Sequence, residues 1–174
     1  DYLFLGTIDK RYPDLYKLDE KRRKDFFEEH KEDKDYEELD ESPFFANGAG
    51  YINHNRSSLF YFNVKDKTIK RLTGRYTNVS DFLIRGNEVF YAATDDKYKS
   101  GIYSSIRKYD LVTKKSNTVI GRNLMIFNIS LVKERIVVVG AKGKRYGINE
   151  NPKFYLLDEE KNRYVLVNDA DESL

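Results

Sequence analysis

Residues 59–73 read LFYFNVKDKTIKRLT, and the same pattern returns twice further along the chain. The second copy, IRKYDLVTKKSNTVI, begins at Ile106, and the third, FYLLDEEKNRYVLV, begins at Phe154. Each copy has an aromatic and apolar stretch, a polar Asn or Asp, a turn with lysine, and a second stretch suited to a strand. The polar residues are 47 and 48 positions apart: Asn63, Asp110 and Asp158. A fixed period of this length is typical of stacked or radially arranged repeats.

Between these copies the sequence predicts two hairpins, one period apart. The first joins 79–84 to 89–94 through a turn that contains Gly86, and the second joins 124–132 to 135–141. The inner runs, VFYAA and IVVVGA, are nearly continuous in apolar residues, as in strands that are covered on both faces. Each period therefore holds four short strands, which is typical of a blade of a β-propeller.

We therefore expect an all-β fold, a partial β-propeller of about three to four four-stranded antiparallel blades in an open ring, in one domain over 1–174. Residues 1–27 read as the remnant of a first blade, with 15–19 as a weaker copy of the repeat and Phe26-Phe27 as its second strand. Residues 28–43 read as an acidic excursion. The expected blades are 36–74, 77–121 and 123–168.

An open ring exposes strand edges that can pair with another chain, so an edge-strand dimer is one expectation. Because residue 1 is Asp rather than Met, we also expect the chain to be a piece of a longer protein.

Composition excludes several classes of site. The chain of 174 residues has no cysteine, so it has no disulfides and no thiolate metal ligands, and we expect a cytoplasmic location. No apolar run approaches the roughly 20 residues of a membrane helix. The net charge of +2 hides an acidic block at 25–41, with ten acidic residues against two lysines. We interpret this block as a solvated surface loop, with a docking surface for a basic partner as the alternative.

Other candidate sites lack the residues that their chemistry needs. His30 and His54 are the only histidines; we expect a solvated side chain for the first and a hydrogen-bonding loop residue for the second. Gly48 and Gly50 do not form a phosphate-binding loop, because the later glycine and a following helix are missing. The sequence predicts no catalytic residue, no metal or cofactor site and no nucleic-acid partner. We read the basic cluster as a solubilising loop and the three glycosylation patterns as chance matches: Lys142, Lys144 and Arg145; Asn55, Asn78 and Asn128.

Between 35 and 94 a series of short motifs follows in a fixed order: Pro43-Phe44-Phe45, Asn47-Gly48-x-Gly50-Tyr51, Arg56-Ser57-Ser58, Leu59-Phe60-Tyr61, Arg71-Leu72-Thr73-Gly74, Val79 to Phe82, and Glu88 to Ala92. This order resembles the propeller of serine peptidases of the prolyl oligopeptidase family. It is most similar to the acylaminoacyl-peptidase and dipeptidyl-peptidase-like branch. The family's Ser-Pro-Asp-Gly-like turn is replaced by Arg85-Gly86-Asn87 and by Lys133-Glu134.

The resemblance implies a propeller that limits access of short peptides to a separate C-terminal α/β-hydrolase domain of the same protein. A nucleophile elbow needs Gly-x-Ser-x-Gly, and here the corresponding glycines, Gly143 and Gly147, have Arg145 between them. We therefore expect no hydrolysis by this chain alone, within a parent protein that resembles a serine peptidase. A non-catalytic propeller-like scaffold that binds protein partners is the alternative. A lyase or glycosidase propeller is a third reading, for which two histidines are too few.

Overall fold

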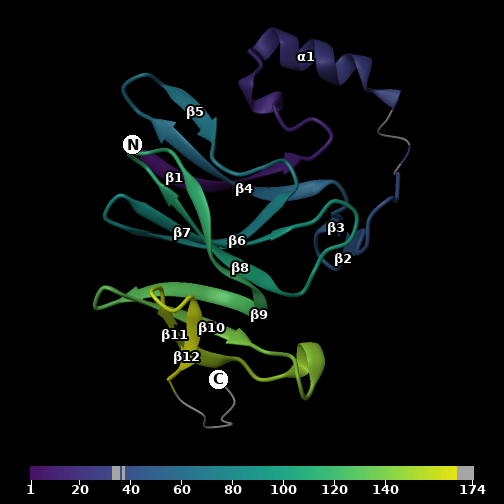
Figure 1. The fold of residues 1–174 in the computed structure, drawn as a ribbon. Helices are drawn as coiled ribbons and strands as arrows, with labels where there is room; N and C mark the ends of the chain where they lie inside the picture. The colour runs from purple at the N-terminus through teal and green to yellow at the C-terminus, as the bar shows by residue number, and fades with distance from the viewer. Residues whose placement is uncertain (33–35, 37, 168–174) are drawn as a thin grey trace. The chain divides into compact units, whose positions relative to one another are not determined.

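The computed structural model describes residues 1–32, 36 and 38–167 (Figure 1). These residues form a mostly β structure with one α-helix and antiparallel sheets, none of which closes on itself. The chain divides into two compact units. The first contains 1–77 and 96–100, and the second contains 78–95 and the chain from 101 onward.

In the first unit, three strands form an antiparallel sheet in the order β1-β4-β5. The strands are β1 (Tyr2–Asp9), β4 (Asn55–Asn63) and β5 (Thr68–Arg71). β1 pairs with β4 along its whole length, from Tyr2 opposite Phe62 to Asp9 opposite Asn55. A separate small hairpin joins β2 (Phe45–Ala46) to β3 (Gly50–Tyr51).

The place of β1 differs from the sequence interpretation, which put residues 2–8 in an earlier blade than 59–73. The two segments are neighbouring strands of one sheet, and the Phe4 and Phe60 rings stack with centroids 5.5 Å apart. Period-2 alternation shows that a segment is a strand, but its hydrogen-bonding neighbour depends on contacts between residues far apart in the chain.

The segment after β1 is helical where the sequence analysis expected strands. Residues 15–19 contain a short 3₁₀-helix (Leu15–Lys17) rather than a fourth copy of the repeat, and Phe26-Phe27 lie in α1 (Glu20–Glu29). Asp19 caps α1, because its carboxylate accepts a hydrogen bond from the Arg22 backbone N–H at 2.8 Å. The first turns of α1 are rich in charged helix formers, which suit a helix exposed to water. The sequence analysis instead expected a strand from the aromatic pair Phe26-Phe27. The helices of the described residues are too short or too polar to traverse a lipid bilayer.

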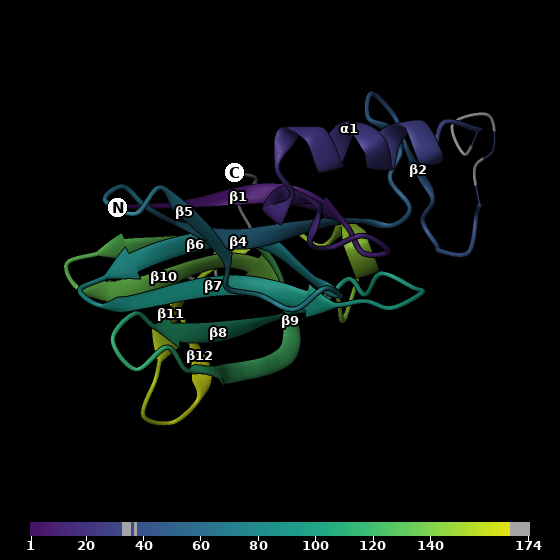
Figure 2. The same cartoon turned by 90° about the horizontal axis from the view of Figure 1, so that it is seen from above.

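The second unit is built on a seven-stranded sheet in the order β12-β11-β10-β9-β8-β7-β6. Its central strand, β9 (Ser116–Val132), has 17 residues and belongs to two halves of the sheet (Figures 1 and 2). The early part of β9 pairs with β8, and the later part pairs with β10. The other strands are β6 (Thr77–Arg85), β7 (Glu88–Asp95), β8 (Ser104–Asp110), β10 (Arg135–Ala141), β11 (Lys153–Asp158) and β12 (Arg163–Leu166).

We call β6, β7, β8 and the early part of β9 the first half, and the later part of β9 with β10, β11 and β12 the second half. Each half is four-stranded. The ladder between β8 and β9 shifts register on both sides of Ile106, and Leu124 lies opposite Ser104 while Ile120 lies opposite Ile106. This irregularity is a bulge, and bulges bend a strand. One strand can therefore serve both halves. The predicted hairpins, β6–β7 and β9–β10, are confirmed.

Each copy of the repeat forms two strands joined by the same turn. The Asn63 side-chain oxygen accepts from the Lys65 and Asp66 backbone N–H groups at 2.9 and 3.1 Å. Asp110 accepts in the same way from Val112 and Thr113, at 2.8 and 2.7 Å. In the third copy Asp158 accepts from Lys161 at 3.2 Å. Four positions after each polar residue the backbone has positive φ: Lys67, Lys114 and Asn162. The polar residue recurs because a side-chain acceptor is needed to close this turn.

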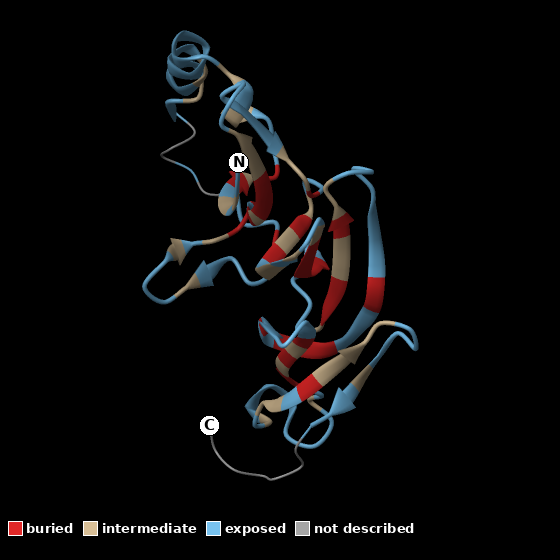
Figure 3. Cartoon of the chain, turned by 90° about the vertical axis from the view of Figure 1, so that its left-hand side faces the viewer, coloured by how far each residue is buried: buried red, intermediate tan, exposed pale blue. Residues whose placement is uncertain are grey.

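The core of the second unit lies between its two halves (Figure 3). Phe90, Ala92 and Ile106 of the first half are fully buried, and they belong to the same cluster as Ile136 and Val138 of the second. Partly buried side chains at the edge of the cluster extend it: Leu83, Leu157 and Tyr164. The core therefore requires both halves.

Candidate functional site

A cluster of buried charged side chains lies in the first unit. It joins Lys10, just after β1, Arg56 on β4 and Glu41 at the end of the acidic block. Their exposed fractions are 5%, 4% and 8%, respectively. Charged side chains are seldom buried this deeply unless they are paired.

The Glu41 carboxylate is the centre of this cluster. Arg56 donates to it through Nη2 at 2.6 Å and through Nη1 at 3.1 Å, so the pair is bidentate. The Lys10 ammonium also contacts the carboxylate, and Lys10 Nζ donates to the Lys97 carbonyl oxygen at 2.8 Å. Arg56 further donates to the Asp96 carbonyl oxygen from Nη2 and Nε, at 2.8 and 3.2 Å. The carboxylate and both cations therefore each have hydrogen-bond partners.

This setting lowers the pKa of Glu41. Burial by itself would raise the pKa, but hydrogen bonds from Arg56, Lys10 and the His54 backbone outweigh it and hold the value at about 2. Glu41 is therefore ionised at neutral pH and compensates the two buried cations.

His54 is almost fully buried and has a φ of 65°. Its backbone N–H donates to Glu41 Oε2 at 2.9 Å, and its Nε2 lies 2.6 Å from Asp40 Oδ1. Because an ionised carboxylate only accepts, Nε2 carries the proton and donates it. His54 is therefore a hydrogen-bonding loop residue, as predicted, and it ties Asp40 to the cluster.

The cluster anchors the end of the acidic block to the first unit. Ser42 forms a parallel bridge with Lys99, with backbone hydrogen bonds of 3.1 and 3.0 Å to Tyr98 and from Ser100. The interpretation of 25–41 as a solvated surface loop is therefore wrong for Glu41, which is buried. Asp25, Glu28 and Glu29 are exposed, as expected, but they lie in α1 rather than in a loop. Residues 33–35 and 37 of this block lie outside the described residues.

His30 is half-buried rather than solvated. Its ring stacks on Phe26 with centroids 4.0 Å apart, and its Nδ1 lies 2.8 Å from the Phe26 carbonyl oxygen. It therefore closes the C-terminal turn of α1. Within the described part of the chain, no three His, Cys, Asp or Glu side chains lie together in a way that holds a metal ion.

The basic loop after β10 is organised by an acidic residue. The Glu150 carboxylate accepts from the backbone N–H groups of Lys142 and Arg145 at 3.2 and 3.1 Å. These hydrogen bonds lower the pKa of Glu150, and the one from the Arg145 backbone has the largest effect. The Arg145 guanidinium lies over the Tyr146 ring at 4.9 Å. Asn128, in one of the three glycosylation patterns that we read as chance matches, donates from its side chain to Asp81 at 3.0 Å.

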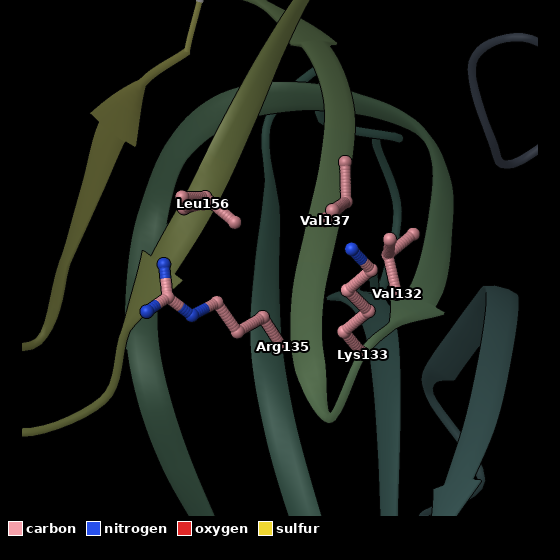
Figure 4. Close-up of a pocket in the computed structure, with 5 residues that line it drawn as sticks. All are labelled: Val132, Lys133, Arg135, Val137 and Leu156. Carbon is pink, nitrogen blue, oxygen red and sulfur yellow. The ribbon is translucent and has the colours of Figure 1, made fainter.

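A pocket of about 390 Å³ opens on the second half of the seven-stranded sheet (Figure 4). It lies at the β9–β10 hairpin and is bounded on one side by β11. Five side chains line it: Val132, Lys133, Arg135, Val137 and Leu156. The lining combines an apolar floor with two cations. The described residues that line it include no carboxylate, so the pocket can bind an acidic or apolar group.

Sequence reasoning did not find the Glu41 cluster or the pocket. Lys10, Glu41 and Arg56 are far apart in the chain, and each one looks like an ordinary surface charge. The one sequence signal is the position of Arg56, a cation at the second residue of β4, directly after the His54 turn. That signal does not name a partner, because the ion pair exists only after β1 and β4 have paired.

No protein-family model and no curated protein sequence matches this chain. Its structure is similar to that of an acylaminoacyl peptidase from Pyrococcus horikoshii, with a TM-score of 0.57 and 14% sequence identity. The similarity covers 96% of this chain and 23% of the peptidase chain. This chain thus spans less than a quarter of the length of that protein, and the likeness is one of fold.

Proposed function

We propose that this chain is a non-catalytic segment of a β-propeller that belongs to a serine peptidase of the acylaminoacyl-peptidase type. In this role it limits access to a separate C-terminal α/β-hydrolase domain of the same protein, so that only short peptides reach the active site. A cytoplasmic location, in keeping with the lack of cysteine, is part of the proposal.

One observation carries the proposal. Two consecutive four-stranded antiparallel halves share β9 and pack on one another through a common core. This arrangement supports the reading of 77–121 and 123–168 as blades, because blades are four-stranded sheets arranged face to face around an axis. The similarity to an acylaminoacyl peptidase along 96% of the chain supports the same reading and adds the class of parent protein.

The assay of the chain itself is the first test. We expect the 174-residue chain to show no turnover of acyl-amino-acid or dipeptide chromogenic substrates. The longer protein is expected to hydrolyse them through a downstream Gly-x-Ser-x-Gly serine. Turnover by the purified 174-residue chain, or a longer protein without this motif, would contradict the peptidase role.

Gating requires a second measurement. In the longer protein, a destabilised second unit, for example with Phe90→Ala, should increase hydrolysis of long peptides relative to short ones. An unchanged ratio of long to short substrates would contradict the gating role. It would also favour the alternative of a scaffold that binds protein partners.

A further inference from the structure

The pocket lies on the face of the second half that points away from the core. In β10, Ile136 and Val138 are 1% and 0% exposed and belong to the core cluster. Val137 and Val139 alternate with them and are only half-buried. Their cross-strand neighbours are Leu156 and Phe154. Since successive side chains of a strand point to opposite faces, these four apolar residues share the outer face.

The register of the two halves shows which residues are equivalent. In the first half a two-residue turn joins Arg85 to Glu88, and Phe90 pairs with Lys108. In the second half a two-residue turn joins Val132 to Arg135, and Val137 pairs with Leu156. The five pocket residues therefore take the places of Arg85, Gly86, Glu88, Phe90 and Lys108.

In the first half, the site equivalent to the pocket is already covered by the second half. Phe90 is fully buried under the second half, and Glu159, in the turn between β11 and β12, reaches Arg85. The Arg85 guanidinium donates to the Glu159 carboxylate at 2.6 and 3.0 Å. Glu88 accepts from Arg85 at 3.0 Å and from Lys108 at 2.6 Å. An acidic turn of the following half thus closes the site over an apolar floor.

The pocket again has two cations, but at other positions than in the first half: Val132 and Leu156 stand where Arg85 and Lys108 do, and the internal carboxylate is missing. Arg135 stands where Glu88 stands in the first half, and Lys133 stands where Gly86 does. Lys133 and Arg135 both border the same hollow (Figure 4). Two cations beside an apolar floor are complementary to one acidic side chain on an apolar surface.

We propose that the outer face of the second half, centred on this pocket, is the docking surface for a further four-stranded repeat of the same polypeptide. An acidic residue in the last turn of that repeat pairs with Arg135 and Lys133, as Glu159 pairs with Arg85. Its apolar inner face covers Val137, Val139, Phe154 and Leu156. The source is the same polypeptide because the first half is likewise covered by the segment that follows it through β9.

The inference rests on the proposed function only in that the chain is a segment of a longer propeller. It does not require a hydrolase domain.

Thiol labelling tests the docking surface directly, because the chain has no cysteine. Val137→Cys should react with a maleimide in the 174-residue chain and at least tenfold more slowly in the longer protein, made cysteine-free elsewhere. Val112→Cys is the control, because Val112 is 67% exposed in the β8–β9 turn and should react equally in both. Equal labelling of Val137→Cys in both proteins, or a reading frame with no further repeat, would overturn the proposal.

Two further measurements separate the alternatives. If protection of Val137→Cys in the 174-residue chain rises with protein concentration, a second copy covers the face and the proposal is wrong. Arg135→Glu should lower the thermal midpoint of the longer protein and leave that of the 174-residue chain unchanged, whereas Lys65→Glu should change neither. Protection of residue 137 in a longer protein without a hydrolase domain would support the docking surface and refute the peptidase role.

Discussion

β7 and β10 are equivalent strands with similar sequences and different surroundings. In β7 every residue from Val89 to Thr94 is buried, so side chains of both faces are removed from water. In β10 burial alternates along Ile136–Val139, with the core-facing side chains buried and the others half-exposed. The two strands carry apolar runs of comparable length, EVFYAATD and RIVVVGA.

The difference shows that an apolar run indicates only that a strand is suited to being buried. Whether its side chains are buried depends on which strands pack against it. Both runs are suited to strands that are covered on both faces. Of these two strands, only β7 has that environment among the described residues. The apolar outer face of β10 is a local inconsistency, which a further repeat would remove.

The strongest test of the comparison is truncation of equivalent side chains. Phe90→Ala should lower the free energy of unfolding by about 3–5 kcal/mol, because a fully buried ring leaves a cavity. Val137→Ala should lower it by about 1 kcal/mol or less, because the valine is half-exposed. Urea denaturation measures both. Equal losses would mean that the outer face of β10 is as well packed as its counterpart.

The response to acid extends the comparison to the first unit. The pKa of Glu41 is about 2, below its ordinary value of 4.5, so its contribution to stability is complete above about pH 4.5. It disappears as the pH falls toward 2. Glu41→Gln should cost about 3 kcal/mol at pH 7, because Lys10 and Arg56 stay buried without their counter-ion. The free energy of unfolding of the Glu41→Gln variant should then decrease less between pH 7 and pH 2 than that of the wild-type chain.

A smaller acid effect is expected in the first half. A hydrogen bond from Lys108, and then one from Arg85, lowers the pKa of Glu88 against the opposing effect of burial. Glu88→Gln should therefore remove a part of the stability that is present at neutral pH and lost below about pH 4.5. Stability curves from pH 7 to pH 3 measure this loss. If Glu41→Gln and Glu88→Gln give identical curves, the distinction between the buried and the half-exposed carboxylate is wrong.

The ion pair between Arg85 and Glu159, which joins the two halves, should have a measurable interaction free energy. A double-mutant cycle with Arg85→Met and Glu159→Gln is expected to give about 1 kcal/mol, because both groups are partly exposed. Arg135→Met, at the place of Glu88, should change stability by less than about 0.5 kcal/mol in this chain. Denaturant midpoints at low salt give these values. A larger loss for Arg135→Met would mean that the pocket already holds a partner.

The smallest effect concerns the two hairpin turns. Lys133 and Glu134 both have positive φ, at 47° and 62°, which glycine tolerates better. Glu134→Gly should stabilise the chain by about 0.5–1 kcal/mol. Asn87→Gly is the matched control in the β6–β7 turn, where Gly86 has the positive φ, and it should not stabilise. Thermal unfolding of the two variants compares the turns, and an equal gain would contradict the difference.

The limits of prediction are clear in particular residues. Asn63, Asp110 and Asp158 predicted the period, and the structure gives their reason, since each accepts backbone hydrogen bonds in its turn. Phe26 and Phe27 suggest a strand because they are adjacent aromatic residues, whereas the cap at Asp19 and the charges around them favour α1. The sequence signal for α1 is a capping residue, Asp19, followed by charged helix formers.

The sequence by itself determined the strands, the repeat and its turns, because alternation, side-chain acceptors and turn residues act between residues close in the chain. Only the tertiary structure decided that β1 pairs with β4, that Glu41 compensates Lys10 and Arg56, and that β9 joins two halves. These facts depend on non-local backbone pairing and on burial, which a linear pattern does not encode. The exposure of the outer face of β10 could not be predicted from the sequence for the same reason. Whether an apolar side chain is buried depends on the surface that packs against it.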